Sequence, residues 1–253
     1  MAAVTVQGSA SVKYDVQVSN VREVTLRGSA DLDFWKKRLV QEGLFPTNAS
    51  GRANLMICAA DARFMGFNFR ELSISVLVSR RDGRTEHDGA FLAYAFNSIR
   101  FFAFVERTLF RTPYHHAGVR VDVGLPALVE ITRGGQSLLR MEMSRNEAAS
   151  ARQPSRDEID GFEGPIFLPG APPGKPNQGR LFFGQLHGQT QAYPFLPTDS
   201  VVLQPTADCP VLQWLVDSNF RGEEWLIRRD ATHGKSKTTR RTVANWFDAS
   251  SQS

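Results

Sequence analysis

Short apolar stretches with a period of two residues recur along most of the chain, and they limit the fold more than any other feature. Near the start, Val16, Val18, Val24 and Leu26 alternate with polar residues until Gly28-Ser29 interrupts the pattern. Such alternation is typical of half-buried β-strands, because successive side chains point to opposite faces. Similar stretches lie at residues 53–78, 90–96, 118–123, 127–132, 137–143 and 180–186, with a further candidate at 225–227. The sequence therefore predicts a mainly β fold.

Three segments instead have the spacing of helices, and capping residues limit them. Asp31 or Asp33 can cap the first, which Gly43 and Pro46 end. The second runs from Asn97 or Ser98 to about residue 110, and the third covers residues 208–216. These helices are short and separated by strands, so we expect an α+β protein with helices beside the sheet.

Residues 53–78 change their apolar face part-way along. Phe67, Phe69 and Glu71 share one parity, whereas Leu72 and the apolar residues after it share the other. This change predicts either a β-bulge or a strand that is covered on both faces. In either case Glu71 lies on the phenylalanine face, which is a candidate pocket wall.

The length and composition favour one domain. The chain has 253 residues, of which 42% are hydrophobic, enough for a full core. We predict a single domain at residues 1–235 and a basic, polar tail at 236–253. Residues 148–178 are rich in small residues and proline, with a capping-box spacing at Ser155 and Glu158, and predict a long excursion or lid. The basic stretch from Arg228 to Arg241 is expected to be exposed.

Several function classes are not expected. The sequence has no apolar run of 18 residues and no signal-peptide pattern, and its two cysteines, Cys58 and Cys209, suit a reducing compartment, so we expect a cytoplasmic protein. The net charge is +4, but the arginines are scattered, which argues against a nucleic-acid or membrane partner. Motifs of the HExxH, CxxC, GxSxG and GxGxxG types are missing from the sequence, so we predict no metal and no cofactor.

Two long motifs carry a family resemblance. The strand FMGFNFRELSISVLV is followed by GAFLAYAFNSIRFFAFVERTLFRTPYHHAGVRV, which combines an aromatic strand, a helix and a Pro-centred strand start. In order and spacing these motifs resemble the acetoacetate decarboxylase superfamily. The resemblance covers about residues 20–230 and is strongest at 52–143. It implies a closed, antiparallel-rich β-barrel with a central pocket, and it implies a homo-oligomer.

The sequence departs from this family at its catalytic motif. In the decarboxylases a proline precedes two lysines. One lysine forms an imine with the substrate, and the other lowers the pKa of that first lysine. Here Pro113 is followed by Tyr114, His115 and His116. None of the six lysines, which are Lys13, Lys36, Lys37, Lys175, Lys235 and Lys237, falls in the expected barrel core. Because tyrosine and histidine cannot form an imine, we predict that Schiff-base chemistry is absent.

Three residues are predicted to be catalytic. Glu71 matches a pocket-facing glutamate of the family and could act as an acid or base, although a salt bridge to Arg70 would explain it equally well. Tyr114 takes the place of the imine lysine and can donate a proton or hydrogen bond. His115 takes the place of the second lysine and titrates near neutral pH. Strand parity groups Tyr114 with His116, so the choice between the two histidines stays open.

Five further residues are predicted to bind substrate. Arg22, in the segment Asn20-Val21-Arg22-Glu23, resembles a family arginine that reaches the substrate carboxylate, with one residue inserted. The other four, which are Phe67, Phe69, His116 and Met141, are expected to line the pocket, although Met141 would also fit the core.

These inferences predict a small-molecule enzyme that uses amine-free acid–base chemistry on a carbonyl or carboxylate metabolite. Decarboxylation, dehydration, carbon–carbon cleavage and cyclisation all suit such a site. The alternative is a barrel that binds a small ligand without turnover.

Overall fold

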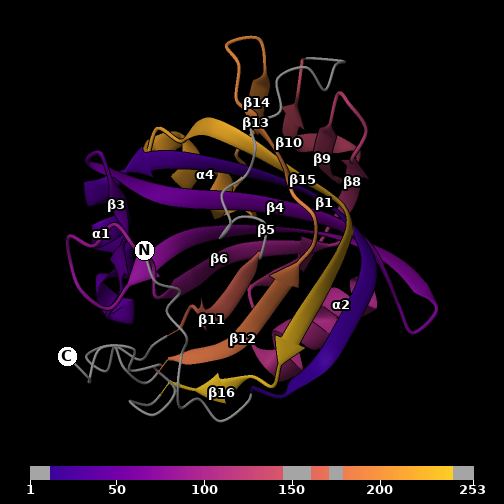
Figure 1. Cartoon of the computed structure of the whole chain (residues 1–253), viewed down its shortest axis with the longest axis horizontal. Helices are drawn as coiled ribbons and strands as arrows, with labels where there is room; N and C mark the ends of the chain where they lie inside the picture. Colours follow the sequence, from indigo (N-terminus) through magenta and orange to yellow (C-terminus); the bar gives the residue numbers. More distant parts are fainter. Residues whose placement is uncertain (1–11, 145–160, 171–178, 242–253) are drawn as a thin grey trace.

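Strands dominate the computed structural model, which describes residues 12–144, 161–170 and 179–241 (Figure 1). In the described part of the chain the strands form a larger and a smaller sheet. The larger sheet contains β1 (Tyr14–Asp31), β2 (Phe45–Pro46), β3 (Asn48–Ala49), β4 (Arg52–Phe64), β5 (Phe67–Ser79), β6 (Gly89–Asn97), β7 (Tyr114–His116), β11 (Phe162–Leu168), β12 (Arg180–His187), β13 (Gln191–Pro194), β15 (Arg221–Ser236) and β16 (Thr239–Arg240). The smaller sheet contains β8 (Gly118–Asp122), β9 (Leu128–Arg133), β10 (Gln136–Glu142) and β14 (Ser200–Leu203).

The larger sheet closes on itself through β15. Strands β15, β1, β4, β5, β6, β11 and β12 pair in that order, and β12 pairs again with the end of β15. β15 is antiparallel to β1 from Tyr14↔Ser236 to Ser29↔Arg221, and it is antiparallel to β12 around Gly184↔Lys235. The pairing is therefore a ring, visible in Figure 1 as strands that wrap around a common axis. The prediction of a mainly β fold is confirmed.

The helices lie beside the sheets, as expected. They are α1 (Leu32–Leu39), the 3-10 turn η1 (Val40–Glu42), α2 (Arg100–Val105), the π-helical turn η2 (Glu106–Phe110) and α4 (Pro210–Asp217). Asp31 caps α1 by accepting a 2.7 Å hydrogen bond from the Phe34 amide, and Gly43 ends η1 with a φ of 64°. None of the described helices is long and apolar enough to cross a membrane.

Residues 53–78 form a hairpin. Met65 and Gly66, whose φ angles are 49° and 86°, turn the chain between β4 and β5. The change of apolar face within β5 comes from cover on both sides, which is the second of the two predicted explanations. Leu72 packs in the main core, whereas the Phe69 ring packs edge-on against Phe102 of α2 at a centroid distance of 5.8 Å.

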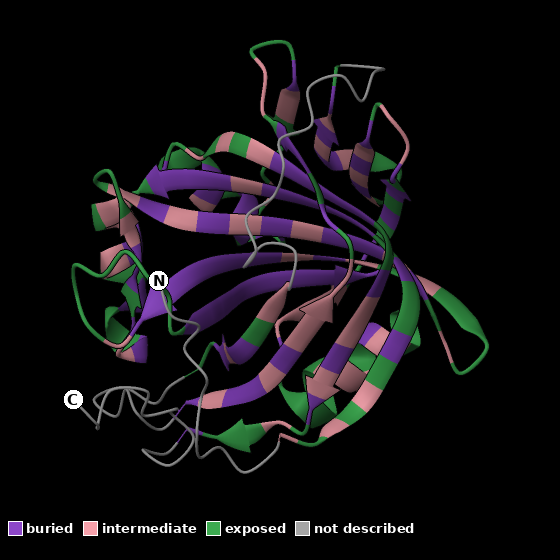
Figure 2. Ribbon diagram, in the orientation of Figure 1, coloured by how far each residue is buried: buried purple, intermediate pink, exposed green. Residues whose placement is uncertain are grey.

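The main core joins one face of the larger sheet to the smaller sheet and to α1 and α4. Trp35 and Trp225 are its largest fully buried side chains, and Met141 of β10 has no exposed surface. Figure 2 shows that β6 and the second half of β5 are buried without interruption, whereas buried and partly exposed residues alternate along β4. Burial of this apolar surface supplies the main driving force for the fold.

Two predictions about where the strands are interrupted were wrong. Residues 148–178 are not wholly an excursion, because β11 lies within them and pairs with both β6 and β12. Gly164 and Pro165 weaken its strand signal. Gly28 does not end β1 either; a side chain there would collide with the Arg221 carbonyl and the Phe220 ring, so this glycine allows close strand approach. The predicted capping box at Ser155 and Glu158 lies outside the described residues.

The basic stretch at the C-terminal end is not uniformly exposed, contrary to expectation. Arg228 and Arg241 keep only 5% and 2% of their surface accessible. Arg241 donates 2.6 Å hydrogen bonds to the Glu42 carbonyl and to Glu42 Oε2, and its backbone N–H bonds to the Gly179 carbonyl. Side chains that satisfy buried acceptors belong to the folded domain.

Arg241→Ala should lower the free energy of unfolding by about 3 kcal/mol, because it leaves the Glu42 carboxylate buried without this partner. The neighbouring Arg240 is exposed, so Arg240→Ala should change it by less than about 0.5 kcal/mol. Urea denaturation followed by tryptophan fluorescence measures both changes. Equal effects of the two substitutions would contradict the structural role of Arg241.

Candidate functional site

Glu71 and Tyr114 meet on one face of the larger sheet. β5 and β7 both flank β6, where Glu71 is paired with Asn97 and Tyr114 with Ala95. Residues two apart on a strand share a face, so the register brings the two side chains together. The Tyr114 hydroxyl donates a 3.1 Å hydrogen bond to Glu71 Oε2. The sequence predicted both residues, and the structure places them in direct contact.

The surroundings of this pair shift both pKa values upward. Burial is the main cause of the raised pKa of Glu71, and the nearby Glu106 carboxylate adds to it; His233, Lys235 and the Tyr114 hydroxyl oppose it. Burial and the charges of Glu71 and Glu106 also raise the pKa of Tyr114 well above its ordinary value. Tyr114 therefore stays a hydrogen-bond donor, while Glu71 can gain or lose a proton closer to neutral pH than an exposed glutamate.

A second buried carboxylate, Glu23 of β1, belongs to the same group. It has no exposed surface and accepts hydrogen bonds from Arg228 at 2.6 Å, from Thr25 at 2.7 Å and from His233 Nε2 at 2.8 Å. Burial would raise its pKa, but Arg228, His233 and Thr25 outweigh burial and lower the pKa to about 2. Glu23 is therefore ionised at neutral pH.

His233 shows the complementary shift. Burial alone would lower its pKa, but the hydrogen bond and the charge of Glu23 raise it above the ordinary histidine value, with a further contribution from Glu71. The imidazole beside Glu23 is thus protonated more readily than that of an ordinary histidine. It is a charged neighbour of Glu71 that the sequence did not reveal.

The third carboxylate is Glu106, at the start of η2. Lys235 Nζ lies 2.6 Å from both of its oxygens, and the Thr112 hydroxyl donates a 2.8 Å hydrogen bond to Oε2. The ammonium also lies over the Phe182 and Phe110 rings, at 4.8 and 5.0 Å from their centroids. Lys235 therefore belongs to the site, contrary to the expectation that every lysine lies outside it.

We call Glu23, Glu71 and Glu106, with Tyr114, Arg228, His233 and Lys235, the carboxylate cluster. Only Glu71 and Tyr114 of its members were predicted. Arg228, His233 and Lys235 all lie on β15, whose sequence was expected to be an exposed basic stretch. The missed signal was charge balance, because buried carboxylates need basic partners.

The two histidines after Tyr114 lie elsewhere. The His115 ring stacks on Tyr94, with centroids 4.4 Å apart and an interplanar angle of 5°. Because side chains alternate along β7, His115 points away from the face that carries Tyr114. His116 is exposed, and within the described residues neither histidine hydrogen-bonds to Glu71 or Tyr114. The predicted grouping of Tyr114 with His115 or His116 is thus not seen as a contact.

The structure disperses most of the predicted substrate-binding residues. Phe69 shares the strand face of Glu71, but Phe67 is 61% exposed near the hairpin end. Arg22 is exposed, and the adjacent Glu23 is the residue that reaches the carboxylate cluster. Met141 is fully buried in the main core, which is the alternative that the sequence left open. Among the described residues, no group of three or more His, Cys, Asp or Glu side chains could hold a metal ion.

Comparison with known proteins identifies the fold. The chain matches none of the protein-family models and none of the curated proteins with which it was compared. Among solved structures it is similar to an acetoacetate decarboxylase from Legionella pneumophila, with 14% identity, a TM-score of 0.63 and coverage of 95% of this chain and 92% of the other.

Two further solved structures agree. An acetoacetate decarboxylase-like enzyme from Sphingomonas wittichii RW1 is 16% identical, with a TM-score of 0.56 over 95% of this chain and 98% of the other. The enduracididine biosynthesis enzyme MppR, complexed with the condensation product of pyruvate and imidazole 4-carboxaldehyde, is 11% identical, with a TM-score of 0.58 over 92% of this chain and 91% of the other. The chain therefore has the acetoacetate decarboxylase-like fold, and the resemblance that its sequence indicated is confirmed at that level.

Proposed function

We propose that the protein is a small-molecule enzyme of the acetoacetate decarboxylase-like superfamily and uses amine-free acid–base chemistry on a carbonyl or carboxylate metabolite. The observation that carries this proposal is the contact between Glu71 and Tyr114. A carboxylate with a raised pKa and a phenol that stays protonated form a base and a hydrogen-bond donor within reach of one another. Perturbed ionisable pairs of this kind are concentrated at functional sites.

The proposed step balances without a cofactor. The ionised Glu71 carboxylate takes a proton from the carbon next to the substrate carbonyl. The electron pair of the broken C–H bond forms the C=C bond of an enolate, and the π pair of the C=O bond moves onto the oxygen. Tyr114 turns its hydroxyl from Glu71 to the resulting enolate oxygen and stabilises its charge. Return of the proton from Glu71 to carbon, or its delivery to a leaving group, completes the reaction.

Substrate would enter a pocket inside the ring of strands, on the face that carries Glu71. The solved structures support this class of ligand, since one neighbour is named for acetoacetate decarboxylation and another contains a condensation product of pyruvate. Phe69 lies on the same strand face as Glu71 and would supply an apolar wall. For Arg22, His115 and His116 to have their predicted roles, these side chains would have to move from their present positions toward Glu71.

The contacts of Lys235 support chemistry without an imine. An amine attacks a carbonyl only through its free lone pair. The Lys235 nitrogen is instead engaged by both oxygens of Glu106 and lies over two aromatic rings. In this arrangement its charge acts on Glu71, and it is not poised as a nucleophile.

The alternative proposal is a protein that binds a small ligand without turnover. It is favoured by the pairing within the carboxylate cluster, where Arg228 and His233 neutralise Glu23 and Lys235 neutralises Glu106. Groups that pair with one another in this way can have a purely structural role, in which they satisfy one another in a polar interior. The two proposals differ in whether bound carbonyl compounds are converted.

Glu71→Gln should lower kcat/KM by about 100-fold or more on any carbonyl substrate that the wild type converts, because it removes the base. Tyr114→Phe should lower it by about 100-fold through loss of the enolate donor. In the wild type, kcat/KM should rise with pH through the raised pKa of Glu71, because the base must be ionised, and this limb should vanish in Glu71→Gln.

The assay is product analysis with acetoacetate, other β-keto acids, and pyruvate paired with an aldehyde, across a pH series. Glu86→Gln is the matched control, because Glu86 is an exposed glutamate of a surface turn and should leave kcat/KM unchanged. Binding of these compounds without any product would support the ligand-binding alternative. Full activity in Glu71→Gln would remove Glu71 from the mechanism.

Borohydride reduction in the presence of the same compounds should leave the mass of the protein unchanged, because no imine forms. Lys235→Met should therefore lower activity only through the electrostatics of Glu71, by shifting the pH limb upward, since removal of a cation disfavours the carboxylate. Lys237→Met, at an exposed position two residues along, is the control and should match the wild type. A substrate adduct on Lys235, seen by mass spectrometry, would contradict amine-free chemistry.

A further inference from the structure

A concave site lies outside the carboxylate cluster, where α2 and η2 meet β7 and the turn between β9 and β10. It is a hollow of about 520 Å³. Its polar walls come from Arg100 and Arg107, from His115 and His116, and from Arg133, while Phe104 supplies an aromatic wall. The sequence alone did not indicate this gathering, because the residues come from separate segments of the chain.

The charged side chains that line this hollow are all basic. No carboxylate is among the residues that line it. Within the described residues, neither Arg100 nor Arg107 forms an ion pair, and Arg133 reaches only the Asp208 carbonyl, at 3.5 Å. Guanidinium groups that converge on a concave surface without acidic partners create a positive potential that attracts anions.

His115 reports the same field. Its pKa is lowered first by burial and then by the charges of Arg107 and Arg133, with no carboxylate among the causes. The ring is fixed by its stack on Tyr94. A rigid imidazole that is kept neutral by neighbouring arginines can donate a hydrogen bond to an anion without adding to the repulsion among the cations.

We propose that this hollow binds a small anionic molecule that carries a dianionic, phosphate-like group next to an apolar or aromatic part. The planar guanidinium group of arginine binds two phosphate oxygens at once, and a group with two negative charges balances several guanidiniums better than a single carboxylate does. Phe104 is 54% exposed and offers a ring face for the apolar part. The volume is within the range of small-molecule sites.

This site is separate from the proposed catalytic pair. Tyr114 faces Glu71, whereas His115 faces Tyr94 and the hollow, because consecutive residues of β7 point to opposite faces. Loss of catalysis at Glu71 would therefore not remove the anion site.

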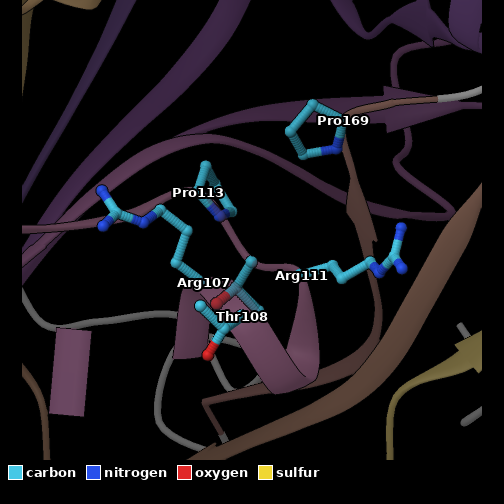
Figure 3. Close-up of a pocket in the computed structure, with 6 residues that line it drawn as sticks. Arg107, Thr108, Arg111, Pro113 and Pro169 are labelled. Atoms are coloured by element: carbon cyan, nitrogen blue, oxygen red, sulfur yellow. The ribbon is translucent and has the colours of Figure 1, made fainter. Parts of the chain in front are cut away.

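A neighbouring hollow provides the internal comparison. It measures about 410 Å³ and is lined by Arg107, Thr108, Arg111, Thr112, Pro113 and Pro169 (Figure 3). In Figure 3 Arg107 and Arg111 extend away from one another on either side of η2. Arg107 thus lines both hollows, Arg111 only the neighbouring one, and Arg133 only the proposed site. Substitution of each arginine in turn locates the bound anion.

Calorimetric titration with phenyl phosphate tests the proposal, with benzoate as a probe of similar ring size and a single negative charge. Phenyl phosphate should bind with a Kd of about 1 mM or tighter, and benzoate at least about tenfold more weakly. Raising the salt concentration from about 0.02 to 0.2 M should weaken phenyl phosphate binding, since the contacts are exposed ion pairs. Equal affinity for the two probes, or no binding of phenyl phosphate, would overturn the proposal.

The variants Arg107→Gln and Arg133→Gln should each weaken binding by about tenfold. Arg111→Gln and Arg120→Gln, the latter at an exposed position of β8 outside both hollows, should leave affinity unchanged. All four positions are exposed, and thermal unfolding verifies that each variant is folded. A loss in Arg111→Gln with full binding in Arg133→Gln would place the anion in the neighbouring hollow and overturn the assignment.

A phosphate group can also come from a lipid. Sedimentation with vesicles of phosphatidylcholine containing phosphatidic acid separates the two sources. The proposal expects phenyl phosphate to bind and to compete with any vesicle binding. Vesicle binding that phenyl phosphate cannot displace, in a protein that does not bind phenyl phosphate itself, would overturn it.

Discussion

The contact of Glu23 with Arg228 and His233 is the interaction on which the rest of this structure depends. A carboxylate with no accessible surface is costly unless it is paired and hydrogen-bonded, and here both cationic partners come from β15. The same strand closes the ring, through β1 along one edge and β12 at its end. Ring closure and charge neutralisation are therefore parts of one packing solution.

An irregularity in the strand pairing allows both cationic partners to reach Glu23. Arg228 and His233 are five residues apart, so in a regular strand they would point to opposite faces. The pairing of β1 with β15 shifts register between Val21 and Glu23, where the β15 partners change from Ala231 to Arg228 and β15 therefore contains one extra residue. Such a bulge changes parity, which lets both side chains reach Glu23. Lys235, two residues beyond His233, consequently shares its face and reaches Glu106.

The sequence predicted those parts of the fold that depend on apolar periodicity. The strands around Ile57, Ile74 and Phe96 and the helix after Asp31 follow from local patterns of burial and capping. β11 was missed because Gly164 and Pro165 interrupt its pattern, and its pairing partners lie far away in sequence. The course of β15 beyond Ile227 was missed because its polar residues face buried acids and therefore resemble a solvated surface.

The residues of the candidate site likewise include some that the sequence could predict and some that it could not. Glu71 and Tyr114 could be predicted because they occupy motif positions in the family resemblance, whereas their contact follows from the pairing of β5 and β7 with β6. Parity alone could not decide the role of His116, which pairs with Asn97 at the end of β7 but has an exposed side chain. Met141 could not be assigned from sequence, because a buried methionine looks the same in a core as in a pocket wall.

The π-helical turn η2 connects the two sites that result. Its first residue, Glu106, holds Lys235 beside Glu71, and its second, Arg107, lines the basic hollow. Single π-turns of this kind are rare in helices and occur often at functional sites, because they shift the direction of the following side chains. Here the turn allows adjacent residues of opposite charge to serve opposite sides of one short segment. A carboxylate therefore faces the cluster while a guanidinium faces the surface, and neither neutralises the other.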